Sequence, residues 1–196
     1  MNLLSVDREL FLKINSFVGE VPILDNLVKL VVNEYFVPVS LALIILYLWF
    51  SHGKMGAKIR ESLPLAVVSV GLINLIITVL NKFIIRPRPF DQLSTNLLFY
   101  KPTDPSFPSN AVAVGFALAV SIFLIDRRLG TFALFLASFY GFSRVYAGVH
   151  FPGDVVVGAL VGIFVVLLVA RFRSLIKFLT KLIERVQVKL KLSLDY

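Results

Sequence analysis

The chain alternates long apolar runs with short polar gaps in which charged residues cluster. Five runs stand out, at Tyr35–Phe50, Ser62–Ile85, Ala111–Ile125, Thr131–Tyr146 and Val155–Ala170. Several are shorter than the roughly 20 residues of a membrane span, so we extend the first back toward Leu27 and begin the third at Ser109. Segments 41–50 and 162–170 lack a polar face at helical period, which disfavours buried helices of a soluble bundle. We expect an all-α polytopic membrane protein, a single domain over residues 1–196 with about five transmembrane helices.

Both ends of the chain are amphipathic rather than uniformly apolar. In residues 1–30 leucine and phenylalanine side chains alternate with charged ones, which predicts an interfacial helix that a turn near Gly19–Pro22 would end. In residues 171–196 apolar side chains stand between basic ones. We expect this tail to continue the fifth helix and then to lie against the inner leaflet as an anchor.

Composition supports a membrane protein and narrows the chemistry. A hydrophobic content of 58% and a mean hydropathy of +0.86 exceed the values of an ordinary soluble domain. The N-terminus lacks the pattern of a cleaved signal peptide, so we expect no removed segment. The absence of cysteine excludes disulfides and thiolate chemistry, and two histidines, His52 and His150, are too few for a histidine-rich metal site. We therefore expect no metal and no cofactor.

The net charge of +8 is unevenly placed along the chain. Basic residues gather after the first, third and fifth runs, at residues 54–60, 127–128 and 171–191. That pattern indicates membrane orientation and anionic lipid contact, and not nucleic acid binding. The positive-inside rule makes these gaps cytoplasmic and the turn carrying His150 extracytoplasmic. Arg86, Arg88 and Lys101 lie on the disfavoured side, where phosphate binding would explain them.

Two motifs on that side favour an anion site. Arg86-Pro87-Arg88-Pro89 follows the second run; its prolines end the helix and stiffen a segment whose guanidinium groups suit phosphate oxygens. Contact with lipid headgroups would also explain these arginines. Pro108-Ser109-Asn110 precedes the third run, and a helix start with free backbone N–H groups attracts anions. Helix capping alone would also account for Ser109.

The third motif, Ser143-Arg144-x5-His150-x3-Asp154, places ionisable residues where two apolar runs meet. Such residues at membrane depth indicate a functional site by default. A histidine between an arginine and a carboxylate can attack phosphorus while the arginine holds the phosphate oxygens and the carboxylate orients the imidazole. An acid in the first turn of a helix is common, so helix stability alone could explain Asp154.

In order and location the three motifs resemble those of the type 2 phosphatidic acid phosphatase superfamily, over about residues 74–165, and most closely its bacterial undecaprenyl-diphosphate phosphatase branch. The resemblance implies a metal-independent phosphatase of the bacterial plasma membrane that passes through a phosphohistidine and recycles the cell-wall lipid carrier. His150 would be the nucleophile and Asp154 its orienting partner, with a polyprenyl or other lipid phosphate as substrate. The implied phosphate-binding residues are Arg88, Ser109, Ser143 and Arg144, and we add Lys82, Arg86 and Asn110 as candidates.

Two departures from the family pattern matter. The first motif has lysine six residues before Arg-Pro, whereas Lys82 stands five before it and Asn81 takes the expected place. One residue is about 100° of helix, although the long lysine side chain could bend toward the site. The second motif has a histidine, the implied general acid, where this chain has Ala111. His52 would lie across the membrane, so the chain is either naturally impaired or, as we favour, an engineered variant.

Other functions remain open at this point. Within the same class the substrate could be phosphatidylglycerophosphate, phosphatidic acid, lipid A or a sugar phosphate. Ala111 also admits a catalytically silent binder or carrier of lipid phosphates. An ion channel would need polar stripes along several helices, and only Asn74 and Thr78 form a short candidate. These two either line the path of a lipid tail entering between helices or, as we favour, form interhelical hydrogen bonds.

Overall fold

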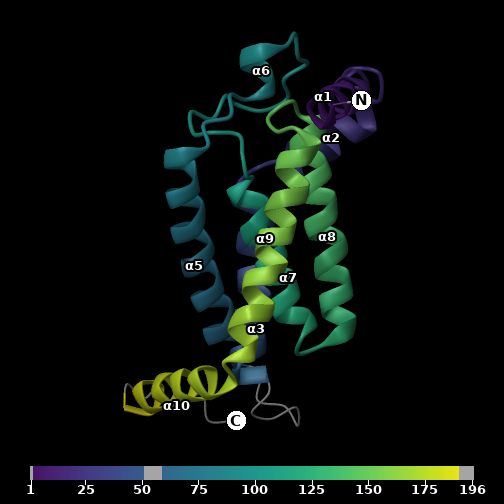
Figure 1. Ribbon diagram of the computed structural model, residues 1–196. Coiled ribbons are helices and arrows are strands. Elements are labelled where there is room, and N and C mark those ends of the chain that lie inside the picture. The colour runs from purple at the N-terminus through teal and green to yellow at the C-terminus, as the bar shows by residue number, and fades with distance from the viewer. Residues whose placement is uncertain (1, 51–58, 190–196) are drawn as a thin grey trace.

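A computed structural model of the protein describes residues 2–50 and 59–189, and within these ranges the chain forms helices and no strands. The predicted all-α class is confirmed. The five apolar runs become α3 (Phe36–Phe50), α5 (Ser62–Phe83), α7 (Asn110–Phe123), α8 (Arg127–Tyr146) and α9 (Pro152–Arg171). These helices run along a common direction (Figure 1). His52, Lys54 and Lys58, which entered the sequence interpretation, lie outside the described residues.

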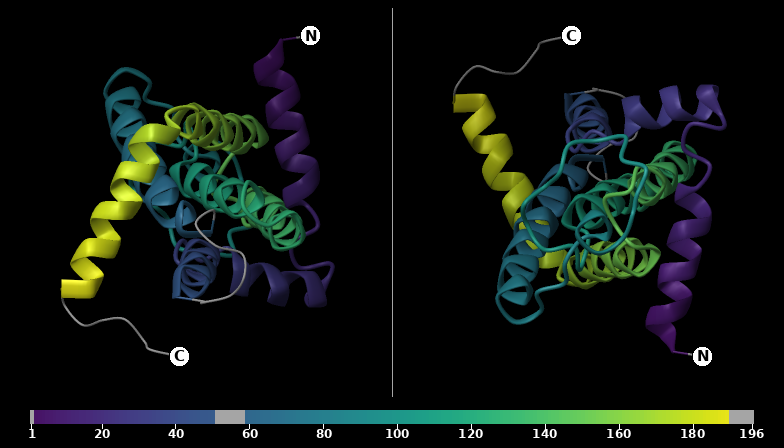
Figure 2. Two further views of the ribbon diagram at one scale, coloured as in Figure 1. Left: turned by 90° about the horizontal axis from the view of Figure 1, so that it is seen from below. Right: turned by 90° about the horizontal axis from the view of Figure 1, so that it is seen from above.

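Helix α7 is the centre of the bundle, since it packs against α3, α5, α8 and α9 (Figure 2). Two glycines of α9 allow a close approach to α7. A Cβ atom at Gly158 would lie 2.5 Å from the carbonyl oxygen of Ser109, and one at Gly162 would lie 2.3 Å from that of Ala113. Small residues four apart let membrane helices approach backbone to backbone. This contact holds the start of α7 against the start of α9, where Ser109 N–H donates to the Asp154 carbonyl.

Two helices, α1 (Leu3–Asn15) and α2 (Pro22–Val31), lie across one end of the bundle (Figures 1 and 2). The predicted turn near Gly19–Pro22 is present, and Gly19 there has a φ of 92°. Residues 3–31 therefore form two helices rather than one. Helix α1 is amphipathic as expected, because Phe11 is fully buried while the charged side chains of Glu9 and Lys13 are exposed. Its location in the membrane interface stays a prediction.

The first span does not extend back toward Leu27 as one continuous helix. Helix α2 ends at Val31, and α3 begins at Phe36 at an angle of 56° to it. The side-chain oxygen of Asn33 accepts the N–H of Tyr35, and such local bonds compete with helix continuation. The break exposes a polar position, Glu34, beside the bundle.

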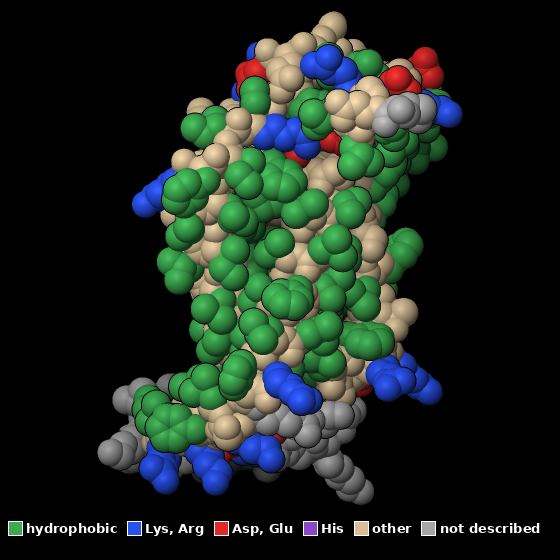
Figure 3. Space-filling model, in the orientation of Figure 1, with side chains coloured by type: hydrophobic (Ala, Val, Ile, Leu, Met, Phe, Trp, Pro, Cys, Tyr) green, Lys and Arg blue, Asp and Glu red, His purple; other side chains and the backbone are tan. Residues whose placement is uncertain are grey.

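The opposite end of the bundle carries α10 (Arg173–Lys189), which lies across the bundle axis (Figure 1). The predicted continuation of the fifth helix is interrupted at Phe172, where α9 has ended. Figure 3 shows hydrophobic side chains over the middle of one face and charged ones toward the two ends. By length and hydropathy α5 and α9 can each cross a membrane, and the bent pair α2 and α3 can count as a third span. The number of transmembrane helices, which we expect to be five, stays a prediction.

The long connection after α5 includes one further short helix, α6 (Pro89–Gln92), at the same end as α1 and α2 (Figure 1). Its prolines act as expected, because α5 stops at Phe83 and Pro89 opens the next helix. The connection continues to Ser109 and covers the ends of α7, α8 and α9. The three predicted motifs therefore meet at one end of the molecule, opposite α10.

Candidate active site

The loop between α8 and α9 places His150 inside the protein. Gly148 has a φ of 86°, a left-handed conformation that favours glycine, and it allows the chain to reverse after α8. The backbone N–H groups of Val149 and His150 both donate to the Arg144 carbonyl, which fixes the loop. The His150 side chain is only 2% exposed. The imidazole therefore has a defined position next to Arg144, at the end of α8.

The surroundings of His150 select one neutral tautomer. Nδ1 lies 2.9 Å from the carbonyl oxygen of Ser106, which can only accept, so Nδ1 carries the proton and Nε2 the lone pair. Burial lowers the pKa of His150 to about 4; Asp154 opposes this effect, and the charges of Arg144 and Arg88 add to it. The ring is therefore neutral at pH 7, with a lone pair available for nucleophilic attack.

Two guanidinium groups flank that lone pair. Nε2 of His150 lies 3.2 Å from Arg88 Nη1 and 3.5 Å from Arg144 Nη2. The Arg88 side chain is 2% exposed and that of Arg144 is 1% exposed. Two buried positive charges beside a neutral nucleophile form an arrangement suited to hold the oxygens of a phosphoryl group.

Each arginine is anchored by groups that a phosphate could replace or supplement. Arg88 donates to the Asp104 carboxylate and to the Val149 carbonyl, each at 2.9 Å. Arg144 donates to the Val32 carbonyl at 3.0 Å and lies 3.4 Å from the Glu34 carboxylate. Asp104 and Glu34 therefore balance the two positive charges.

Asp154 orients the imidazole through a third residue rather than directly. Its Oδ2 atom is 3.8 Å from His150 Nδ1, too far for a hydrogen bond. The same oxygen accepts from the Ser106 hydroxyl at 2.5 Å and from the Phe151 N–H at 2.9 Å. The hydroxyl of Ser106 is in turn 3.3 Å from Nδ1. Ser106 thus links the carboxylate to the ring.

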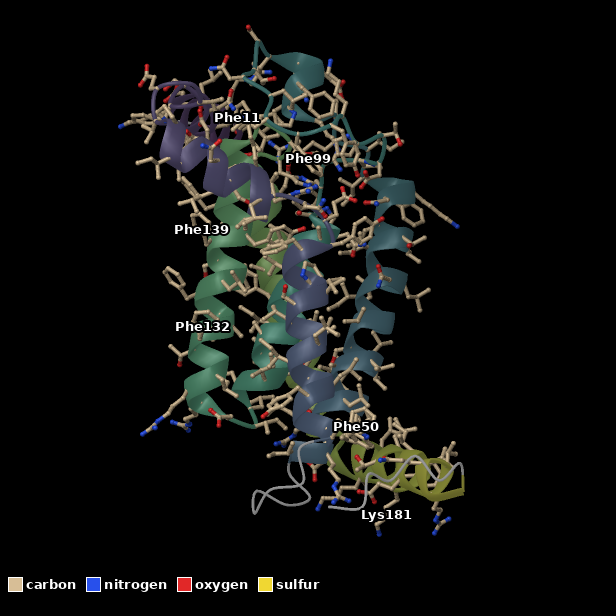
Figure 4. The ribbon with its side chains drawn as sticks, turned by 180° about the vertical axis from the view of Figure 1, so that it is seen from behind. Phe11, Phe50, Phe99, Phe132, Phe139 and Lys181 are labelled. Carbon is tan, nitrogen blue, oxygen red and sulfur yellow. The ribbon has the colours of Figure 1, made fainter. Side chains whose placement is uncertain are left out.

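The site opens into a cavity of about 380 Å³, which is within the usual range for small-ligand sites. Figure 4 shows nitrogen-bearing side chains gathered close to Phe99, and the Arg144 guanidinium lies 5.4 Å from the Phe99 ring centroid. Ala111 forms part of the wall and faces the same space as His150, which places the position predicted for a general acid beside the imidazole. The cavity is lined by Glu34, Pro38, Arg88, Tyr100, Lys101, Pro102, Thr103, Asp104, Asn110, Ala111, Val114, Arg144 and His150.

The two predicted serines occupy different environments. Ser109 is the N-cap residue of α7, as expected, but its hydroxyl makes no capping bond. That hydroxyl is buried and has no hydrogen-bond partner among the described residues. Ser143 is also buried, and its hydroxyl donates to the Tyr140 carbonyl at 2.7 Å. Neither lines the cavity, and only Ser109 has a hydroxyl free to bind an anion.

The remaining candidates are also spread over different environments. Asn110 lines the cavity and donates to Asn74 at 2.9 Å, which is the interhelical hydrogen bond expected of Asn74. Lys82 is exposed and does not line the cavity, whereas the side-chain oxygen of Asn81 is buried. Arg86 also lies outside the cavity, because it pairs with two carboxylates. The structure therefore places neither Lys82 nor Arg86 at the cavity beside His150.

Glu34 and Asp104 were absent from the sequence interpretation, and Ser106 was given no role in it although it lies in the segment Pro105–Asn110 that carries the second motif. Glu34 is an isolated acid beside an apolar run, which is a usable signal. Ser106 precedes Ser109 by three residues and belongs to the same segment as the second motif. Nothing in the sequence distinguishes Asp104 from an ordinary solvated loop acid.

Comparisons with known proteins identify relatives of this chain. A family model described as the PAP2 superfamily matches residues 63–177. The undecaprenyl-diphosphatase BcrC of Bacillus subtilis (strain 168) is 27% identical over 181 residues, 92% of this chain and 91% of that protein. YbjG of Escherichia coli (strain K12) is 30% identical over 162 residues, 81% of this chain and 78% of that protein. The crystal structure of Aquifex aeolicus LpxE matches with a TM-score of 0.70 and 29% identity, covering 84% of this chain and 94% of that chain.

Proposed function

This chain belongs to the PAP2 superfamily, and from that premise we propose that it releases phosphate from undecaprenyl diphosphate through a phosphorylated His150. The observation that carries the proposal is the placement of Nε2 of His150 between the guanidinium groups of Arg88 and Arg144. The similarity to BcrC supports the diphosphate substrate. The guanidinium groups of Arg88 and Arg144 supply the positive charge that a metal ion would otherwise provide to the phosphate oxygens. The proposed reaction is therefore metal-independent.

In the first step, Nε2 of His150 attacks the terminal phosphorus. The Nε2–P bond forms as the bond from phosphorus to the bridging oxygen breaks, and undecaprenyl phosphate leaves. Arg88 and Arg144 hold the transferred oxygens. The ring becomes positively charged, and Asp154 stabilises that charge from the Nδ1 side through Ser106.

In the second step, water attacks the phosphohistidine, the Nε2–P bond breaks and inorganic phosphate leaves. Both steps benefit from an acid–base group near the moving oxygen, and Ala111 cannot supply one. A leaving lipid phosphate is already a stable anion and needs this help less than an alkoxide does. The proposed impairment therefore affects lipid diphosphates less than phosphate monoesters.

A second candidate function is the binding of lipid phosphates without hydrolysis. Only the alanine at position 111 favours it. The two functions differ when Ala111→His protein in bilayers is given undecaprenyl diphosphate or phosphatidic acid and phosphate release is measured. Release that exceeds that of the unchanged chain supports the phosphatase. Retention of the labelled diphosphate by both proteins without release supports the binder and contradicts the proposed function.

We also propose that the site faces the extracytoplasmic side of a bacterial plasma membrane. The site lies at the end opposite the basic helix α10, which supports this orientation. The chain has no cysteine, so single cysteines report topology cleanly. In intact cells a membrane-impermeant maleimide should label Lys101→Cys at the cavity and spare Arg128→Cys at the start of α8. Labelling of Arg128→Cys alone would reverse the orientation.

A further inference from the structure

The geometry points to Arg86 and Asp7 as positioning residues that connect the terminal helix α1 to the carboxylate beside His150. The inference rests on the proposed function, in which that carboxylate supports the phosphorylated imidazole. It gives Arg86 a role different from the phosphate binding expected from the sequence. It also gives α1, which lies outside the three motifs, a part in the site.

Arg86 bridges two carboxylates on the side of the site away from the cavity. Its Nη1 atom donates to Asp154 Oδ1 at 2.5 Å, and its Nη2 atom donates to Asp7 Oδ2 at 2.6 Å. The guanidinium carbon lies 4.2 Å from the ring centroid of Phe151. All three charged side chains are shielded from solvent, with exposures of 20% for Arg86, 13% for Asp7 and 0% for Asp154. Such shielded pairs are weakly screened by salt.

Asp154 depends on this arginine because its carboxylate is fully buried. A buried carboxylate without a cationic partner is costly and tends to become protonated. Its two oxygens have separate duties, since Oδ1 binds Arg86 while Oδ2 accepts from Ser106 and Phe151. Arg86 therefore supplies the cationic partner of the buried carboxylate and sets its rotation. That rotation directs Oδ2 to the Ser106 hydroxyl and, through it, toward Nδ1 of His150.

Asp7 holds Arg86 in place from α1. Its Oδ1 atom accepts the N–H of Gly153 in the first turn of α9 at 2.7 Å, while Oδ2 accepts from Arg86. The same helix buries Phe11, whose ring meets that of Phe151 edge-on with centroids 5.4 Å apart. Helix α1 therefore contacts the site twice, through the Asp7 carboxylate and through the Phe11 ring.

Kinetics on the Ala111→His background give the first test. Asp7→Asn keeps an acceptor for Gly153 but removes the charge that holds Arg86, and Arg86→Gln removes the bridge. We expect each to lower kcat by about 10- to 100-fold while leaving KM for the lipid within about 3-fold. Arg86→Lys should recover part of the loss. Because Asp7 acts through Arg86, the double variant should be no slower than Arg86→Gln alone.

The matched control is Glu9→Gln, an equal charge change at an exposed position of α1. It should leave kcat unchanged. Losses that multiply in the double variant, losses confined to KM, or a lowered melting temperature with kcat unchanged would each overturn the inference.

The second test needs no turnover. The chain has two histidines, so His52→Asn leaves the His150 ring as the single imidazole signal in 15N-histidine NMR. The Nδ1 proton resonance should shift in Asp7→Asn and Arg86→Gln and stay in place in Glu9→Gln. An unmoved resonance in both variants contradicts the inference. If the resonance moves while the Ala111→His parent releases no phosphate from any lipid, the proposed function fails and the positioning role stands.

Discussion

His150→Asn is expected to lower phosphate release by on the order of 10⁴-fold or more, even when Ala111→His is also present, because the attacking atom is lost. Asparagine keeps one contact, since its amide nitrogen can donate to the Ser106 carbonyl in place of Nδ1. The fold and the affinity for lipid phosphate should therefore persist. The measurement is single-turnover phosphate release, together with the melting temperature.

The matched control for this variant is His52→Asn, which removes the other histidine and should leave the rate unchanged. Release that survives in His150→Asn at more than a small fraction of the parent rate would contradict the nucleophilic role. Equal losses in the two variants would point to a general effect on the protein.

Ala111→His is expected to raise the rate of phosphate release by about 100- to 10,000-fold, the usual contribution of a general acid or base. Ala111 lines the cavity together with His150, so an imidazole at this position would face the reacting phosphate. The gain should depend on the leaving group. Undecaprenyl diphosphate expels a stable phosphate anion, whereas phosphatidic acid expels an alkoxide, which needs a proton more.

The comparison uses kcat/KM for both lipids in both proteins. We expect the larger gain for phosphatidic acid and the larger residual activity of the unchanged chain for undecaprenyl diphosphate. Equal gains for the two lipids would show that position 111 does not protonate the leaving oxygen.

Long apolar runs located all five helices of the bundle, because such runs are typical of helices in a membrane protein. They did not reveal the break between Val31 and Phe36, where the Asn33 side chain bonds to the backbone. The central part of the site was also predictable. His150 and Arg144 differ sharply from the apolar residues around them, and so they could be identified before any contact was known.

The partners of those residues could not be predicted, because tertiary packing decides them. Arg86 has the side chain expected of a phosphate ligand, yet it binds carboxylates 79 and 68 positions away in the chain. The role of Ser106 depends on a loop fold that brings it under the imidazole. The sequence alone also left open whether the Lys82 side chain could bend toward the site. Lys82 stands one position after the place that the family pattern expects, and on α5 it is exposed, whereas the side-chain oxygen of Asn81 is buried.

The most direct test of the mechanism is to trap the phosphorylated enzyme. The unchanged chain would be mixed with undecaprenyl diphosphate labelled in its terminal phosphate, quenched rapidly at alkaline pH and digested for mass spectrometry. Because Ala111 slows attack by water, the labelled protein should accumulate, with the phosphoryl group on Nε2 of His150, and then release inorganic phosphate. Release of labelled phosphate with no label on His150 at any time would contradict the account.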